Sequence, residues 1–154
     1  MIDVSEMKIR VAMVNDIPQL VTIRLSVKEN ILSNPTLISE KDYNEFLTKR
    51  GKGWVGEINN KIVGFAIVDM LHNNVWALFI EPGFEKLGIG RKLHDEMLNW
   101  YFSQTNNTLW LGTSPHTRAY AFYHRAGWKE GGLHGKGEIK FEMTNDNWKL
   151  LRDK

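Results

Sequence analysis

The stretch from Asn74 to Lys92, NVWALFIEPGFEKLGIGRK, constrains the fold of this chain more than any other. An apolar run from Val75 to Ile80 predicts a strand, which ends just before Pro82. A loop containing Gly88 and Gly90 follows, and a helix is predicted directly after it. This arrangement presents unpaired backbone N–H groups at the positive end of a helix dipole, and glycines let a ligand approach them closely. We therefore interpret the stretch as a phosphate-binding loop beside a strand end.

Two common phosphate-binding loops do not match these residues. A P-loop requires Gly-Lys followed by Ser or Thr, whereas Gly90 is followed by Arg91 and Lys92. A dinucleotide fingerprint requires a third glycine, where this chain has Leu93. The remaining pattern, x-x-x-Gly-x-Gly after a strand, resembles the acetyl-CoA signature of the GNAT superfamily of N-acetyltransferases, which reads Arg/Gln-x-x-Gly-x-Gly/Ala. Glu85 stands where that family usually has Arg or Gln. The alternative is a glycine loop that only turns a strand into a helix.

Composition narrows the class of protein. At 154 residues the chain is predicted to form a single domain, residues 1–154, because it is too short for two ordinary domains. A hydrophobic content of 42% and a charged content of 25% are typical of a globular protein. The net charge of +2 gives no reason to expect a nucleic-acid partner. The chain has no cysteine, and we see neither a membrane span nor a signal peptide, so a cytoplasmic location is expected.

The first third of the chain predicts a strand and two helices. Lys8 to Met13 alternates as a strand, and Asn15-Asp16 is predicted to cap a helix. A loop is marked by Ser33-Asn34-Pro35, and Ser39 resembles the start of a capping box for the second helix. Gly51 is expected to end that helix. The apolar face of the first helix comprises Leu20, Ile23, Val27 and Ile31.

The middle and the last third predict most of a sheet. Gly53–Ile58 and Lys61–Met70 are strands joined by a tight turn, and they lead antiparallel into Val75–Ile80. A helix then crosses to a strand at Thr108–Leu111, which makes that strand parallel to Val75–Ile80 if the two are neighbours. Glu138–Met143 is expected to be the closing strand. The fold class is therefore α/β (α+β), with a mixed, mostly antiparallel sheet of about six to seven strands flanked by helices. The tail from Asn145 is uninformative.

A second motif lies near residue 120 and supports the same resemblance. Ser114-Pro115 is predicted to open a helix that runs from His116 to Ala126. Its letters, HTRAYAFYHRAGW, are similar to the family segment Asn-x-x-x-Ala-x-x-x-Tyr-x-x-x-Gly-Phe, read loosely. Tyr123, Gly127 and Trp128 match it, while His116 stands where Asn is common. Both motifs occur in the expected order, and the resemblance covers nearly the whole chain.

The resemblance implies an acetyl-CoA-dependent N-acetyltransferase that moves an acetyl group directly to a primary amine. In the family two parallel strands are splayed apart and the pantetheine arm enters the gap; here these are Val75–Ile80 and Thr108–Leu111. The resemblance implies that the backbone N–H near Leu78 stabilises the oxyanion. Tyr123, which stays protonated at neutral pH, is the implied acid for the leaving thiolate. The residues predicted to contact acetyl-CoA are Leu78, Phe79, Ile80, Lys86, Leu87, Gly88, Ile89, Gly90, Arg91, Lys92, His116 and Tyr123.

The sequence identifies neither a general base nor the acceptor. Most of an alkyl amine with a pKa of about 10.4 is protonated at neutral pH, so a base or a desolvating site is needed. The groups considered are Glu57, Asp69, His72, Glu81 and His116, each of which also reads as a solvated side chain. No metal-binding pair or acyl-serine motif is present, so no metal is expected.

Three further points stay open. Tyr123 also reads as a core aromatic residue. The alternative functions are a non-catalytic acyl-CoA-binding domain and a protein-interaction domain of the same fold. A small-molecule or peptide amine is the expected partner, and a homodimer is compatible because dimers are common among proteins that look like this.

Overall fold

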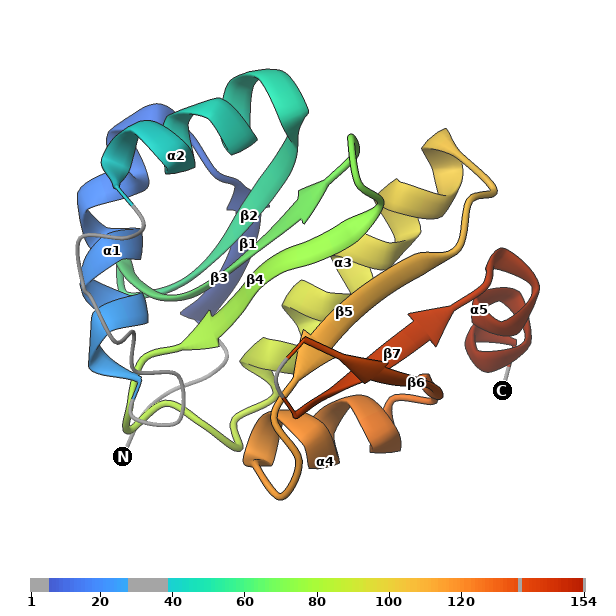
Figure 1. The fold of residues 1–154 in the computed structure, drawn as a ribbon. Coiled ribbons are helices and arrows are strands. Elements are labelled where there is room, and N and C mark those ends of the chain that lie inside the picture. Colours follow the sequence, from blue (N-terminus) through green and yellow to red (C-terminus); the bar gives the residue numbers. More distant parts are fainter. Residues whose placement is uncertain (1–5, 28–38, 136, 154) are drawn as a thin grey trace.

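The computed structural model describes residues 6–27, 39–135 and 137–153, which form a mixed sheet with helices on both of its faces (Figure 1). Within these residues the sheet has seven strands in the order β1-β2-β3-β4-β5-β7-β6, and β4 and β5 are its parallel pair. This confirms the predicted fold class. The strands are β1 (Met7–Val11), β2 (Gly51–Ile58), β3 (Lys61–Asp69), β4 (Asn74–Ile80), β5 (Leu109–Thr113), β6 (Lys129–His134) and β7 (Glu138–Met143). The α-helices are α1 (Ile17–Ser26), α2 (Glu40–Glu45), α3 (Ile89–Gln104), α4 (Arg118–Arg125) and α5 (Asn145–Arg152).

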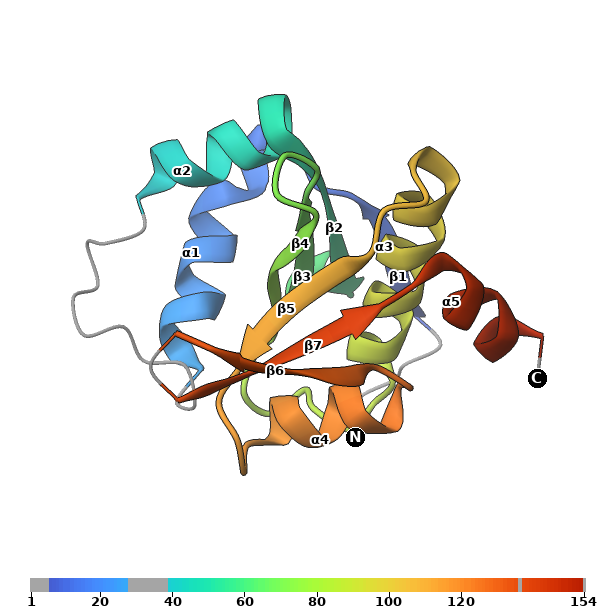
Figure 2. The same ribbon diagram turned by 45° about the vertical axis from the view of Figure 1, so that its right-hand side comes forward.

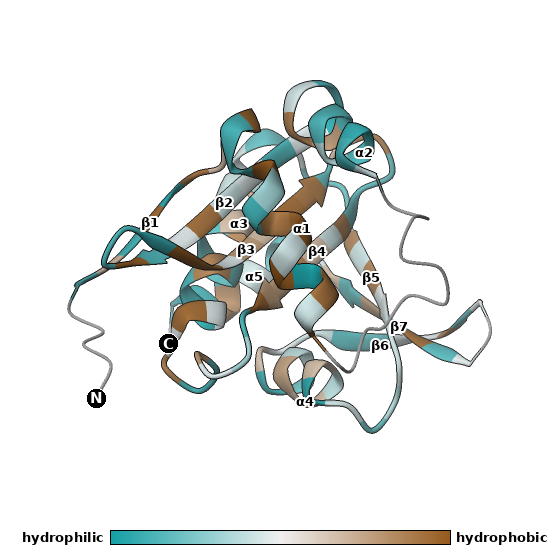
Figure 3. Cartoon of the chain, turned by 90° about the vertical axis from the view of Figure 1, so that its left-hand side faces the viewer, coloured by the Kyte–Doolittle hydropathy of each residue, from teal (hydrophilic) through white to brown (hydrophobic). Residues whose placement is uncertain are grey.

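Each face of the sheet has its own core. On one face α1, α2 and the π-turn Phe46–Arg50 bury Leu20, Tyr43 and Phe65. On the other face α3 packs its buried side against the sheet, and α4 and α5 complete the core. Figure 3 shows apolar residues concentrated along the central strands and polar residues on the outside of α2. The alternation of side chains along the strands therefore serves two cores at once.

Several local signals in the sequence correspond to observed features. Asn59 and Asn60 both adopt positive φ, 52° and 67°, in the turn that joins β2 to β3. Ser39 caps α2, since its backbone N–H donates to Asp42 Oδ2 at 2.8 Å and its hydroxyl accepts from the Asp42 N–H. The predicted Ser33–Pro35 loop and the predicted helical position of Ile31 lie outside the described residues.

Three elements differ from expectation. The helix predicted to open at Ser114-Pro115 begins at Arg118, because His116 has a φ of 63° and Thr117 caps the helix by accepting from the Tyr120 N–H at 3.1 Å. Strand β6 was not predicted, since its residues are all exposed and give no apolar alternation. Helix α5 was not predicted either. It is anchored by the buried Trp148, whose Nε1 donates to Asn99 Oδ1 of α3 at 3.0 Å.

The parallel pair β4 and β5 stays together for only one register position. Asn74 pairs with Trp110, whose backbone N–H donates to Asn73 O at 3.0 Å, and the two strands then part. On its other side β4 remains paired with β3, although the register shifts so that Val75 faces Val68 while Ala77 faces Ile67. One extra residue is thus inserted in β4, which bends and twists a strand locally. The gap between β4 and β5 opens towards their C-terminal ends.

A buried histidine ties α3 to the C-terminal part of the chain. His94 is fully buried, and the Trp128 indole N–H donates to its Nε2 at 2.9 Å. Because an indole N–H can only donate, Nδ1 carries the imidazole proton and donates to Asp95 Oδ1 at 2.8 Å. Burial lowers the pKa of His94, and the Asp95 carboxylate opposes that shift only in part. The folded structure therefore favours the neutral imidazole of His94.

We therefore expect acid to destabilise the fold through His94. The unfolded histidine binds a proton below its ordinary pKa of 6.5, whereas the folded one does not, so stability is full above that pH and falls as the pH drops. The slope is at most about 1.4 kcal/mol per pH unit. His94→Gln keeps an acceptor for Trp128 and removes the titration. Chemical denaturation between about pH 5 and 7 should show a flatter pH dependence for this variant. Equal slopes in both proteins would mean that His94 is not the group responsible.

Candidate active site

A cleft of about 840 Å³ occupies the place where β4 and β5 part. Its walls come from both strands, from the loop after β4, from α4 and, at one end, from Val27 after α1. Gly88 and Tyr123 lie on the α3 side of the sheet, while Trp76 and Phe79 belong to the core on the α1 side. The cleft therefore passes through the sheet from one face to the other.

The loop before α3 forms a cradle of backbone N–H groups. Gly88, the N-cap of α3, has a φ of 88° and a ψ of 0°, and Lys86 before it also has a positive φ of 64°. No side chain among the described residues caps this helix, so the N–H groups of its first turn are available to a ligand. A Cβ added at Gly88 would meet no atom within 4 Å, which shows that the space beside the loop is open. An anion such as a pyrophosphate fits this arrangement.

Charged side chains around the cleft are mostly basic. The basic residues of the lining are Lys86, Arg91, Arg118 and Arg125, and the acidic ones are Glu85 and Glu138. An excess of basic groups in a partly enclosed cleft favours a phosphate-bearing ligand.

Glu85 does not present a free carboxylate to the cradle. Its Oε1 accepts from the Gly83 N–H at 2.7 Å, and its Oε2 accepts from Arg118 Nη1 at 3.3 Å. Hydrogen bonds from its own backbone and from Gly83, together with Arg118, lower the pKa of Glu85. The Glu85 carboxylate therefore points towards its own loop and towards the Arg118 guanidinium of α4. This pairing reduces the repulsion that a carboxylate at this position would otherwise exert on a pyrophosphate.

Tyr123 lies in α4 and lines the cleft. It is buried, and its ring packs against Phe122, Trp128 and Phe141, with His94 behind it. Burial raises the pKa of Tyr123 well above its ordinary value of 10, so the phenol stays protonated at neutral pH. A protonated hydroxyl at the wall of a cleft can donate a proton or a hydrogen bond to a ligand there.

A model of the acetyltransferase (GNAT) family matches residues 18–128 of this chain. The chain belongs to the GNAT acetyltransferase family. Its fold is similar to that of the PaiA N-acetyltransferase of Thermoplasma acidophilum, solved in complex with coenzyme A, with a TM-score of 0.79 and 15% identity over 90% of this chain and 98% of that one.

Two other solved GNAT structures resemble the chain. The ribosomal-protein-S18-alanine N-acetyltransferase of Escherichia coli has a TM-score of 0.70 and 20% identity, covering 89% of this chain and 91% of that one. The spermidine/spermine N-acetyltransferase SpeG of Vibrio cholerae, in mutant form, has a TM-score of 0.68 and 17% identity, covering 97% and 99%. A comparison with curated proteins found no match. At these identities the structural likeness shows the GNAT fold alone.

The cleft of this GNAT domain brings together most of the residues predicted from sequence. Those that line it are Leu78, Phe79, Ile80, Lys86, Gly88, Gly90, Arg91 and Tyr123. The other four are not part of the lining. Leu87 packs on the core, Ile89 is buried in it, Lys92 is exposed, and His116 lies exposed in the turn before α4.

The carboxylates considered as a general base lie elsewhere. Glu57 pairs with Arg10 at 2.9 Å, and Glu81 lies 3.0 Å from the Lys61 ammonium. Asp69 is buried and pairs with Arg50 at 2.6 Å, with His72 beside it. None of these side chains lines the cleft. Their positions in structural ion pairs favour the interpretation that they hold the fold together.

Sequence reasoning missed several residues that line the cleft. They include Val27 after α1, Trp76 in β4, Arg118 and Arg125 in α4, and Glu138 at the start of β7. These residues come from different elements and meet at one cleft only because the two strands part, which no local sequence pattern indicates.

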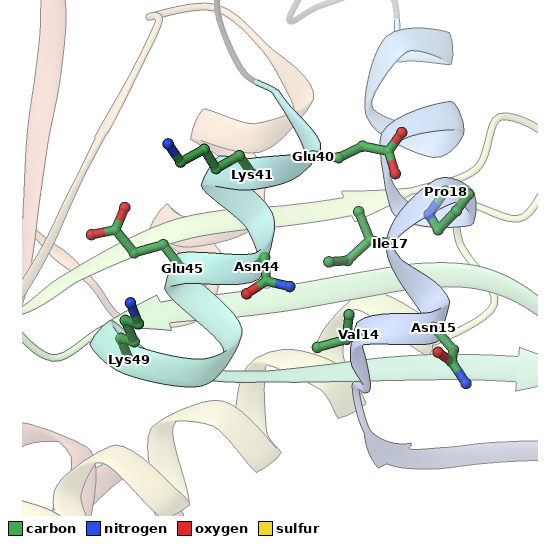
Figure 4. A pocket seen from close by; sticks show the side chains of 9 residues that line it. All are labelled: Val14, Asn15, Ile17, Pro18, Glu40, Lys41, Asn44, Glu45 and Lys49. Carbon is green, nitrogen blue, oxygen red and sulfur yellow. The ribbon is translucent and has the colours of Figure 1, made fainter.

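A second, more open pocket lies away from this cleft, between α1 and α2 (Figure 4). It has a volume of about 580 Å³, and Val14 and Ile17 form its apolar floor. Its rim carries charges of both signs, from Glu40, Lys41, Glu45 and Lys49. No residue of β4, β5 or the glycine loop lines it.

Two searches for other features concern the described residues only. No group of three or more His, Asp or Glu side chains in that part of the chain is placed to hold a metal ion. No helix there has the length and apolar character needed to cross a membrane.

The two glycines of the loop differ in what they tolerate. A side chain at Gly88 must adopt a left-handed backbone, at a cost of about 1–2 kcal/mol. A Cβ at Gly90 would make ordinary contacts, 3.6 Å from Ile80 Cγ1, inside a helix that prefers alanine. We expect Gly88→Ala to destabilise the protein and weaken coenzyme A binding about 10- to 100-fold by displacing the N–H groups of the cradle. Gly90→Ala is the matched control for stability and should not destabilise the protein, because its Cβ fits and its backbone is already helical.

Calorimetry with coenzyme A and chemical denaturation measure the two effects. Wild-type affinity in Gly88→Ala would remove the loop from the phosphate site. A loss of stability in Gly90→Ala equal to that in Gly88→Ala would show that the left-handed backbone at residue 88 is not the deciding feature.

Proposed function

We propose that this chain transfers the acetyl group of acetyl-CoA directly to a primary amine of a small molecule or peptide. The observation that carries the proposal is the cleft between β4 and β5, with the N–H cradle on one side of the sheet and Tyr123 in its wall. Membership of the GNAT family supports the chemistry. The coenzyme A complex of the Thermoplasma PaiA structure and the acceptors named for two other neighbours, a ribosomal-protein alanine and spermidine/spermine, are consistent with it.

The chain's own groups divide the work along the cleft. The first turn of α3 and the basic residues Lys86 and Arg91 hold the pyrophosphate, while the backbone of β4, freed from β5, pairs with the amide groups of the pantetheine arm. When bound, acetyl-CoA supplies the activated acetyl group. The backbone N–H near Leu78 is the proposed donor to the carbonyl oxygen as negative charge develops on it.

The proton balance assigns a role to Tyr123. The amine nitrogen forms a bond to the acetyl carbon and loses a proton, while the carbon–sulfur bond breaks and the sulfur gains one. Tyr123 is the proposed donor to the sulfur, because its phenol is protonated and lies in the wall of the cleft. The proton from the amine leaves through solvent in the cleft or through a carboxylate at its edge; Glu138 is the acidic residue of the lining that Arg118 does not neutralise.

The proposal is tested by Tyr123→Phe, which removes one oxygen from the cleft wall. Loss of a positioned general acid typically lowers the rate by ~10²–10⁴-fold, so the turnover number should fall while coenzyme A affinity stays close to wild type. Tyr120→Phe is the matched control. It lies on the same helix, and its hydroxyl donates to Glu130 on the surface at 3.0 Å. Release of free thiol with a panel of amines measures turnover, and calorimetry measures binding.

Two outcomes would contradict the proposal. Wild-type turnover in Tyr123→Phe, with chemistry shown to be rate-limiting, would make Tyr123 a core aromatic residue. Tight coenzyme A binding without thiol release for any amine would favour a non-catalytic acyl-CoA-binding domain.

A further inference from the structure

Arg24, near the end of α1, carries a charge that the fold does not neutralise. Its Nε and Nη1 atoms are buried and make no hydrogen bond, and no carboxylate of the described residues pairs with it. Burial lowers the pKa of Arg24, and the nearby Tyr43 opposes that shift only in part. A buried guanidinium without an anion is costly, because the desolvation of its charge is not repaid by a partner.

The guanidinium lies against the wall of the cleft at its α1 end. Its Cζ atom is 4.6 Å from the centre of the Phe79 ring and 5.6 Å from the centre of the Trp76 ring. Both of these residues line the cleft, and so does Val27, about one helical turn after Arg24. Figures 1 and 2 show the C-terminal end of α1 at the same end of the molecule as the C-terminal end of β4.

This end of the cleft is the one that the acceptor would enter. The cradle and Tyr123 occupy the α3 side of the sheet, so a ligand that meets the acetyl group from the opposite side passes Phe79 and Trp76. Arg24 rests on ring faces and is partly exposed as a residue, so rotation about its side-chain torsions can turn its planar fork towards a ligand. Carboxylates are the anions that accept such a fork in two parallel hydrogen bonds.

We propose that Arg24 binds a carboxylate of the acceptor, so that the acceptors are amines that carry a carboxylate near the reacting nitrogen, as amino acids do. The inference rests on the proposed acetyl transfer for its use of the amine. The aromatic wall formed by Phe79 and Trp76, continued by Phe46 stacked on Trp76 at 4.1 Å, favours an apolar side chain on that acceptor. A polyamine, which has no carboxylate, would meet an unneutralised cation at this position.

Matched acceptors that differ only in charge test the proposal. Leucine and leucinamide differ by the carboxylate, and spermidine represents the polyamines. One hydrogen-bonded charge pair corresponds to about 10- to 100-fold, which is the expected preference of the wild-type protein for leucine over leucinamide in affinity and in kcat/KM. Amidation lowers the pKa of the neighbouring amine and so favours the amide as a nucleophile, which means that greater amine reactivity cannot produce this preference.

Two variants separate recognition from packing. Arg24→Gln should abolish the preference for leucine, and Arg24→Lys should keep part of it, because lysine retains the charge and loses the fork. The midpoint of denaturation of Arg24→Gln should not fall, since the substitution removes an unpaired buried charge. Arg152→Gln is the control. It removes an exposed arginine of α5 that donates to Asn99, and the preference should remain at the wild-type level.

Binding and turnover are measured separately, because binding tests the role of Arg24 and turnover tests the proposed acetyl transfer. Calorimetry on the protein saturated with coenzyme A compares leucine with leucinamide, and equal affinities in the wild type would overturn the role of Arg24. A preference that persists in Arg24→Gln would overturn it as well. Absence of thiol release with every amine would count against the proposed acetyl transfer, while the calorimetric preference would still decide whether Arg24 recognises a carboxylate.

Discussion

The parting of β4 from β5 after a single residue pair is the constraint on which the rest of this structure depends. Two parallel strands that stayed paired would satisfy each other's backbone groups and seal the sheet. Here only Asn74 and Trp110 are paired, and beyond them the edge of β4 faces a cleft. The glycine loop and α4 lie on one face of the sheet, and the end of α1 lies on the other. They line one cleft only because the sheet is open between them.

Local patterns in the sequence predicted the elements whose cause is local. The capping box at Ser39, the paired asparagines at residues 59 and 60, and the glycine loop before α3 each specify their own geometry within a few residues. Helix α5 and strand β6 escaped prediction because neither has a clear apolar pattern: Trp148 is the buried residue of α5, and every residue of β6 is exposed. The Trp148 indole bonds to Asn99, and β6 is held by its pairing with β7 rather than by an apolar pattern of its own.

The residues of the candidate site also fall into those that a local sequence pattern predicts and those that it does not. The two motifs predicted the loop and Tyr123, because each motif consists of neighbouring residues in one helix and the loop beside it. The ion pair of Glu85 was not predictable from the sequence, because its partner Arg118 lies on another element. The unpaired charge of Arg24 was equally hidden: sequence shows an arginine on a helix, whereas only the packed structure shows that Phe79 and Trp76, rather than a carboxylate, lie beside it.

The extra residue in β4 changes the course of the strand without exchanging its two faces. Trp76 and Ala77 both face the α1 side, so the residues after them keep the sides they would have if the extra residue were absent. Inserting one amino acid here therefore bends the strand without turning its apolar face outwards. The direction of β4 beside the cleft is thus set independently of which side chains fill the two cores.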